Sequence, residues 1–153
     1  MPVQTAKPDA AVLGAIATLQ RLSESFQLRR EQLARGAGLT VQQWRVLEEI
    51  GGENFMPSMF ARERESSPAA VSKIIRQLLD KGLVAVSVSE ADGRQRDYAL
   101  TAAGRRVMER LRESRSRAVA AVWSGLDAAR LADFTSFSSE LINRLESYAS
   151  RER

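Results

Sequence analysis

The clearest amphipathic pattern in the chain lies between residues 67 and 82. Its apolar positions recur at steps of three and four residues, which is the spacing of one face of an α-helix. These positions are Val71, Ile74, Ile75, Leu78 and Leu79. Ser67 can cap the first free N–H groups, and Pro68 suits the first helical position. Gly82 suits the residue just beyond the last turn, so the pattern predicts a helix that begins at Pro68 and ends before Gly82.

The opposite face of this predicted helix is polar, with short side chains at its start and longer, mostly cationic ones behind. Its members are Ser66, Ala69, Ser72, Lys73, Arg76 and Gln77. Small residues permit close approach to a DNA major groove, and Ser, Lys, Arg and Gln can reach phosphates or base edges. For this stretch alone, an ordinary solvated amphipathic helix is the competing interpretation, so the flanking segments decide between the two.

Helices are also predicted upstream. A first helix should begin at Pro8–Asp9, after a loose tail, and run to about Arg35, with glycines at 36 and 38 ending it. Its apolar positions are Val12, Ile16, Leu19, Leu22 and Phe26. Thr40 and Gln43 form a capping-box pattern for a second helix. The buried edge of that helix should consist of Trp44, Leu47 and Ile50.

A short third helix should begin at Pro57 and end near Glu65. A tight turn then leads into the helix that begins at Pro68. Two helices joined by so short a turn form a helix-turn-helix, whose second member is the one presented to DNA.

Beyond Gly82 the pattern changes to alternation, with Leu83, Val84, Val86 and Val88 among small residues, which predicts a strand with one buried face. Asp92–Gly93 indicates a turn, and residues 96–100 form the return strand. A hairpin directly after a recognition helix indicates a winged helix-turn-helix. Its predicted tip holds Arg94, Gln95 and Arg96, and arginines at such a tip suit the minor groove.

Two further helices complete the pattern. Thr101 should cap a long helix whose many arginines we interpret as a solvated face, relieved by Glu109 and Glu113 at helical spacing. Gly125 interrupts the chain, and Asp127 should cap the last helix. A heptad-like seam runs along it, at Leu131, Phe134, Ser138, Leu141, Leu145 and Tyr148. Such a seam predicts packing against another helix.

Composition excludes several classes of site. The 153 residues contain neither cysteine nor histidine, which removes disulfides, thiolate zinc sites and Ser-His or Cys-His catalysis. We expect no cofactor and no metal. Glu48 and Glu49 are adjacent rather than facing, so they do not form an acid–base pair. No run approaches a membrane span and no signal pattern is present, so we expect a cytoplasmic protein and no membrane partner.

The net charge is +4, and all but three of the 23 basic residues are arginine. Arginine is always charged and can bind phosphate through two N–H groups. A polyanionic partner is therefore plausible, although a balance of +4 is weak support on its own.

These segments together resemble the MarR family of transcriptional regulators. The run from Ser67 to Lys73, continued from Leu78 to Val84, is similar to that family's recognition-helix signature. The stretch from Asp92–Gly93–Arg94 to Leu100–Thr101 resembles its wing and the exit into the next helix. Leu39–Thr40 followed by Trp44, Val46 and Leu47 is similar to its second helix.

The resemblance implies a mainly α fold with a small β-hairpin wing. It assigns residues 37–100 to a winged helix-turn-helix and residues 1–36 with 101–153 to helical dimerisation. It also implies a homodimer on double-stranded DNA, usually a repressor, that a small aromatic or phenolic acid can release. In this interpretation the DNA contacts come from Ser66, Ser67, Ala69, Ser72, Lys73, Arg76, Arg94 and Arg96, with Asp92 orienting Arg94.

An effector pocket between the helices would need apolar walls and a cationic anchor for a carboxylate. The candidates are Phe26, Trp44 and Leu47 for the wall, and Arg30 or Arg45 for the anchor. The competing interpretation is that Phe26 and Trp44 simply belong to the core.

Arg64–Glu65–Ser66 departs from the family, which tends to have two apolar residues and a glycine there. The missing cysteine excludes the family's peroxide-sensing branch, and the missing histidine argues against its zinc-sensing branch. Two other functions stay open at this point. A winged helix can serve protein–protein contact, or it can bind DNA without sequence preference.

Overall fold

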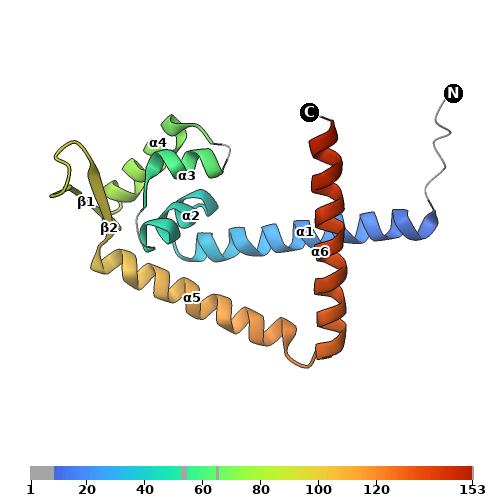
Figure 1. Ribbon diagram of the computed structural model, residues 1–153. Coiled ribbons are helices and arrows are strands. Elements are labelled where there is room, and N and C mark those ends of the chain that lie inside the picture. Colours follow the sequence, from blue (N-terminus) through green and yellow to red (C-terminus); the bar gives the residue numbers. More distant parts are fainter. Residues whose placement is uncertain (1–8, 53–54, 65, 153) are drawn as a thin grey trace. The chain divides into compact units, whose positions relative to one another are not determined.

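The computed structural model describes residues 9–52, 55–64 and 66–152, and these residues are mainly helical (Figure 1). The elements in chain order are α1 Ala10–Gly36, α2 Val41–Ile50, α3 Pro57–Glu63, α4 Pro68–Asp80, β1 Val84–Val88, β2 Arg96–Leu100, α5 Ala102–Trp123 and α6 Ala128–Arg151. The predicted mainly α fold with a hairpin wing is therefore confirmed. The chain divides into two compact units, Met1–Arg115 and Ser116–Arg153. The core described next belongs to the first unit.

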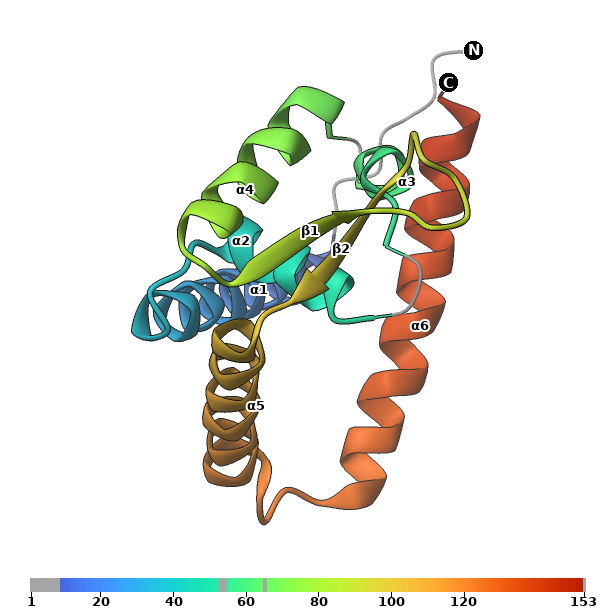
Figure 2. The ribbon, with the colours of Figure 1, turned by 90° about the vertical axis from the view of Figure 1, so that its left-hand side faces the viewer.

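The core of the first unit forms where α4 packs against α2, α3 and β1 (Figure 2). Helix α4 contributes its predicted apolar face, of which Val71, Ile75 and Leu78 are buried. Helix α2 contributes its own buried apolar edge, which consists of Trp44, Val46, Leu47 and Ile50. Leu47 and Leu78 are completely shielded from solvent. Burial of this apolar surface is the main stabilising contribution to the winged helix.

The predicted helix caps are present. The Thr40 side chain accepts a hydrogen bond from the Gln43 N–H, and the Gln43 side chain accepts one from the Thr40 N–H, so the capping box is complete. Ser67 accepts from the Ala70 N–H at 3.1 Å, and Asp127 accepts from the Arg130 N–H at 2.9 Å. These bonds satisfy N–H groups that a helix start would otherwise leave unpaired.

The hairpin differs from its prediction in one respect. Strands β1 and β2 pair antiparallel, with Val84 opposite Leu100 and Val88 opposite Arg96. Of the predicted apolar residues Leu83 and Val84 are buried, whereas Val86 and Val88 are exposed. The prediction of one buried face along the whole strand was therefore wrong. Core residues reach only the base of a projecting two-stranded ribbon, so the remaining valines meet solvent.

The hairpin base is tied to the start of α5 by close backbone packing. The Thr101 hydroxyl donates to the Gly82 carbonyl at 2.7 Å and accepts from the Gly104 N–H at 3.0 Å. The Thr101 N–H donates to the Leu83 carbonyl at 3.1 Å. A Cβ at Gly104 would lie 2.1 Å from that same carbonyl oxygen. The wing and α5 can approach this closely only because residue 104 is glycine.

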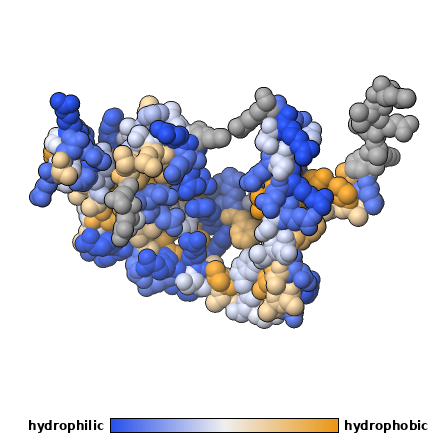
Figure 3. Space-filling view, viewed as in Figure 1, coloured by the Kyte–Doolittle hydropathy of each residue, from blue (hydrophilic) through white to orange (hydrophobic). Residues whose placement is uncertain are grey.

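Two helices carry apolar faces that are exposed to solvent. Along α1 these side chains are Val12, Ile16, Leu19, Leu22 and Phe26, and Figure 3 shows the apolar surface over the N-terminal half of this helix. Along α6, in the second unit, they include Phe134, Phe137, Ile142, Leu145 and Tyr148. None of the described helices has the length and apolar character needed to cross a membrane.

We expect Gly104→Ala to destabilise the protein by about 1–3 kcal/mol, because the added methyl group collides with the Leu83 backbone. Chemical denaturation would measure the loss. Gly36→Ala is the matched control, since Gly36 is also helical and has open space around its Cβ position. Equal stability of Gly104→Ala and the parent protein would contradict the close approach described above.

Candidate nucleic-acid interface

The polar face of α4 is fully available to a ligand in the first unit. All six predicted residues on and before this helix are exposed: Ser66, Ser67, Ala69, Ser72, Lys73 and Arg76. The opposite face is held in the core by Val71, Ile75 and Leu78. Because the buried face fixes the helix, the exposed face presents small residues at the N-terminus and two cations behind them.

The turn that leads into α4 is stabilised by its own backbone. The Ser66 N–H donates to the Ala61 carbonyl at 2.8 Å, which closes the end of α3. Ser67 then caps α4, and Pro68 takes the first helical position. The polar turn Arg64–Glu65–Ser66 is described at its two ends only, since Glu65 lies outside the described residues.

The wing tip is organised by Asp92. Its carboxylate accepts from the backbone N–H of Arg94 at 3.1 Å, and its carbonyl accepts from the Gln95 N–H at 2.9 Å. Asp92 therefore shapes the turn through the backbone rather than through the Arg94 guanidinium. Arg96 is the first residue of β2. Asp92, Arg94 and Arg96 are all exposed, and the wing tip is hydrophilic in Figure 3.

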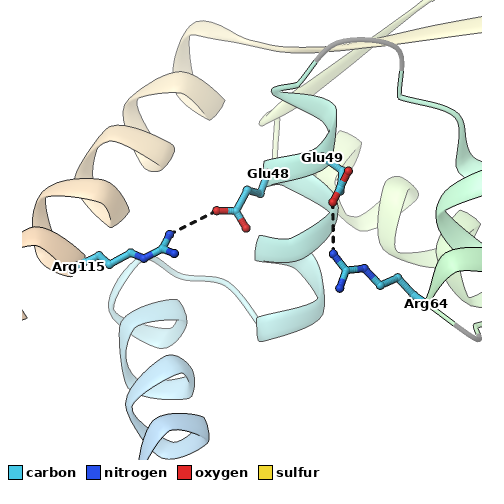
Figure 4. Close-up of polar contacts among 4 residues, drawn as sticks. All are labelled: Glu48, Glu49, Arg64 and Arg115. Atoms are coloured by element: carbon cyan, nitrogen blue, oxygen red, sulfur yellow. Dashed lines mark hydrogen bonds and ion pairs between the residues drawn. The ribbon is translucent and has the colours of Figure 1, made fainter. Parts of the chain in front are cut away.

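Two ion pairs connect α2 to its neighbours (Figure 4). Arg115 of α5 lies 3.6 Å from Glu48, and Arg64 lies 3.4 Å from Glu49. All four side chains are substantially exposed, so each pair contributes little to stability. They do place a positive charge beside each of the two glutamates of α2. Among the described residues, no cluster of three or more potential ligand side chains could hold a metal ion.

A groove of about 850 Å³ lies between the C-terminal half of α1 and the start of α2. It is lined by Phe26, Gln27, Arg30, Glu31, Arg35, Leu39, Thr40, Val41, Gln42 and Arg45. Three arginines against one glutamate give the lining a positive balance. The groove brings together three of the five predicted effector residues, namely Phe26, Arg30 and Arg45.

The other two predicted effector residues lie elsewhere. Trp44 lines a second cavity of about 290 Å³, together with residues of α5 such as Met108 and Leu111. Leu47 is completely buried in the core and lines neither cavity.

Arg30 is the most constrained cation of the groove. Its guanidinium lies 5.1 Å from the centre of the Trp44 ring, within range of a cation–π interaction. Burial, and secondly the positive charge of Arg45, lower the pKa of Arg30 from its usual value. The buried Nε of Arg30 has no hydrogen-bond partner. An anion bound in the groove would relieve the repulsion between the two arginines.

Sequence inspection missed two contributions to these sites. Arg35 lines the groove but was treated only as the end of a helix. Gln43 was assigned to the capping box, yet its side-chain amide also donates to Gln77 of α4 at 3.0 Å. Thirty-four positions separate these two residues, and no local periodicity links them.

The comparisons with known proteins agree with this geometry. Residues 37–95 match the model of the MarR family. None of the curated proteins matches the chain. The matched region runs from the end of α1 to the turn of the hairpin and contains the whole helix-turn-helix.

Several solved structures share the fold. A MarR family transcription regulator is 17% identical with a TM-score of 0.80, covering 92% of this chain and 93% of that one. Streptococcus pneumoniae FabT in complex with DNA is 19% identical with a TM-score of 0.76, covering 89% and 98%. Staphylococcus aureus MarR in complex with salicylate and kanamycin is 15% identical with a TM-score of 0.73, covering 91% and 95%.

The structural similarities show a common fold, and the family match covers α2, α3, α4 and β1. Residues 37–95 thus match the MarR family of winged helix-turn-helix transcriptional regulators, and the solved structures show that the chain shares the fold of such regulators.

Proposed function

We propose that the protein is a homodimeric repressor that binds a near-palindromic operator in the cytoplasm and is released by a small aromatic acid. The observation that carries the proposal is the exposed polar face of α4, from Ser66 to Arg76, in the same unit as an arginine-bearing wing. The exposed face of α4 favours DNA over a protein partner, because it offers small polar and cationic side chains and no large apolar one.

In this proposal α4 lies in the major groove. Ser67 and Ala69 permit close approach at the N-terminus of the helix, and Lys73 and Arg76 reach phosphates or base edges. Arg94 enters the adjacent minor groove, presented by the turn that Asp92 stabilises. The structurally similar S. pneumoniae FabT was solved in complex with DNA, which supports DNA as the partner.

The exposed apolar faces of α1 and α6 support the homodimer. Phe134, Leu145 and Tyr148 of α6 are each about half exposed or more in the single chain, and apolar patches of this kind mark interfaces. The predicted dimerisation regions, residues 1–36 and 101–153, contain both faces. A two-fold pair would place its recognition helices about 34 Å apart, one turn of DNA.

The positively charged groove beside Arg30 and Arg45 supports an anionic effector. A carboxylate would pair with the guanidinium groups, and Phe26 and Val41 supply apolar wall for a ring. Salicylate is present in the structure of S. aureus MarR, which makes it a reasonable first probe. Release requires that the ligand favour a conformation that cannot bind DNA.

Substitutions on α4 and the wing test the docking. We expect Arg94→Ala to weaken operator binding several-fold or more, since it removes the minor-groove contact. We expect Lys73→Ala to reduce the slope of log affinity against log salt by about one, because one phosphate contact is lost. Fluorescence anisotropy at several salt concentrations, on a duplex selected by the wild-type protein from a random pool, would measure both.

Arg106→Ala is the matched control for these two variants. It removes the same charge from an exposed position of α5, outside the proposed interface. Unchanged binding by both test variants would contradict the docking. Equal affinity of the wild-type protein for selected and scrambled duplexes would favour binding without sequence preference.

The homodimer is tested on α6. Sedimentation equilibrium should give twice the chain mass of 16.9 kDa for the wild-type protein. We expect Leu145→Asp to shift the population toward single chains, because a carboxylate would be buried in the apolar interface. Ser147→Asp, on the polar side of the same helix, should leave the mass unchanged. A wild-type protein that sediments as a stable single chain would exclude the dimer.

The effector groove is tested with salicylate and benzoate. We expect millimolar salicylate to lower the affinity of the wild-type protein for the selected duplex, and Arg45→Gln to lose most of this response. Arg62→Gln, an exposed arginine of α3 outside the groove, serves as the control. A response that Arg45→Gln retains in full would place the ligand elsewhere.

A further inference from the structure

Gln43 is the one polar side chain that is buried among the residues the structure describes, with 6% of its surface exposed. Both functions of its amide are used. The oxygen accepts from the Thr40 N–H at 3.1 Å, and the nitrogen donates to the Gln77 oxygen at 3.0 Å. The first bond stays within α2, whereas the second joins α2 to the middle of the C-terminal half of α4.

We infer that Gln43 is a positioning residue for sequence-specific DNA binding, acting through Gln77 to fix the rotation of α4 about its own axis. Gln77 directly follows Arg76 and lies four positions after Lys73, so it belongs to the same turns of the helix that carry the two proposed phosphate and base contacts. A small rotation of α4 would move both cations relative to a base pair.

The Gln43–Gln77 hydrogen bond depends more sharply on the orientation of α4 than the apolar contacts around it do. Apolar contacts between α2 and α4 hold the two helices together, but their energy depends on buried area rather than on angle. A hydrogen bond weakens steeply as its geometry departs from linear. Leaving the buried Gln43 amide without a partner would cost about 1–3 kcal/mol. The Gln43–Gln77 bond therefore sharpens the rotation that the buried apolar face of α4 sets approximately.

The remaining ties of α4 lie at its end. Lys81 Nζ donates to the Gly38 carbonyl at 2.7 Å, and the Gly82 carbonyl accepts from Thr101 at 2.7 Å. Both are at exposed positions just beyond the helix, where they fix its C-terminal end. The described residues include no other side-chain hydrogen bond that joins α4 itself to α2, α3 or the hairpin. Within α4, the rotation of the helix is therefore constrained by the bond to Gln43.

This inference rests on the proposed docking of α4 in the major groove, and a double-mutant cycle separates the two. Gln43→Met and Gln77→Met each remove the bond while keeping the length of the side chain, and Gln43→Met also removes the acceptor of the Thr40 N–H. We expect each to lower the affinity for the selected duplex about tenfold, and the double variant to bind no worse than either single variant. Affinity for a scrambled duplex should change much less, because nonspecific binding does not require the correct rotation.

Gln43 cannot contact DNA itself, since it is buried. If Gln77 instead touches DNA directly, the two losses will add and the inference is wrong. If Arg94→Ala and Lys73→Ala weaken binding but Gln43→Met does not, the docking stands and the positioning role fails. A general loss of stability would lower selected and scrambled binding alike, which would also overturn the inference.

A measurement without DNA gives a second readout. We expect Gln43→Met and Gln77→Met to speed amide hydrogen exchange in residues 68–80 of the free protein, because α4 gains freedom to rotate and open. Gln42→Met is the matched control, since Gln42 is the exposed neighbour of Gln43 in the same turn. Unchanged exchange in α4 of both test variants would contradict the positioning role.

Discussion

The winged helix depends on one packing contact, the burial of the apolar face of α4 against α2. Leu47 and Leu78 are completely shielded at this contact, and Val71 and Ile75 extend it along the helix. Because the apolar side of α4 is buried against its neighbours, the serines, lysine and arginine on the opposite side face solvent. The same contact that stabilises the fold therefore creates the surface proposed to bind DNA, and a core substitution there would change both.

Much of the fold could be predicted from local sequence. Thr40, Ser67 and Asp127 each cap the helix that was expected to follow, since a cap depends on residues within one turn. The strand face was the exception, because Val86 and Val88 have the alternation of a buried strand but lie beyond the reach of the core. Whether an apolar residue is buried depends on how far neighbouring elements extend, which periodicity does not contain.

The candidate site could likewise be predicted only where it depends on local sequence. Exposed positions of α4 followed from helix geometry, whereas the groove beside Arg30 required the packing of α1 against α2. Leu47 and Trp44 were predicted as walls of one effector pocket with Arg30, yet Leu47 is completely buried, and Trp44 contacts Arg30 but lines a second cavity. The Gln43–Gln77 bond joins residues far apart in sequence. Pairings of this kind arise only when the tertiary structure brings two helices together.

The exposed upper part of the hairpin has a consequence for how regulators of this architecture diversify. Beyond the pair Val86–Tyr98 the two strands support each other through cross-strand pairing and contribute little to the core. Each added pair of residues would extend the ribbon by about 3.3 Å per position without disturbing the helices. In the proposed docking, the distance that the wing spans along a DNA duplex depends on the length of the hairpin. Insertion or deletion at the tip would change which base pairs the wing contacts, while the helices keep their stability.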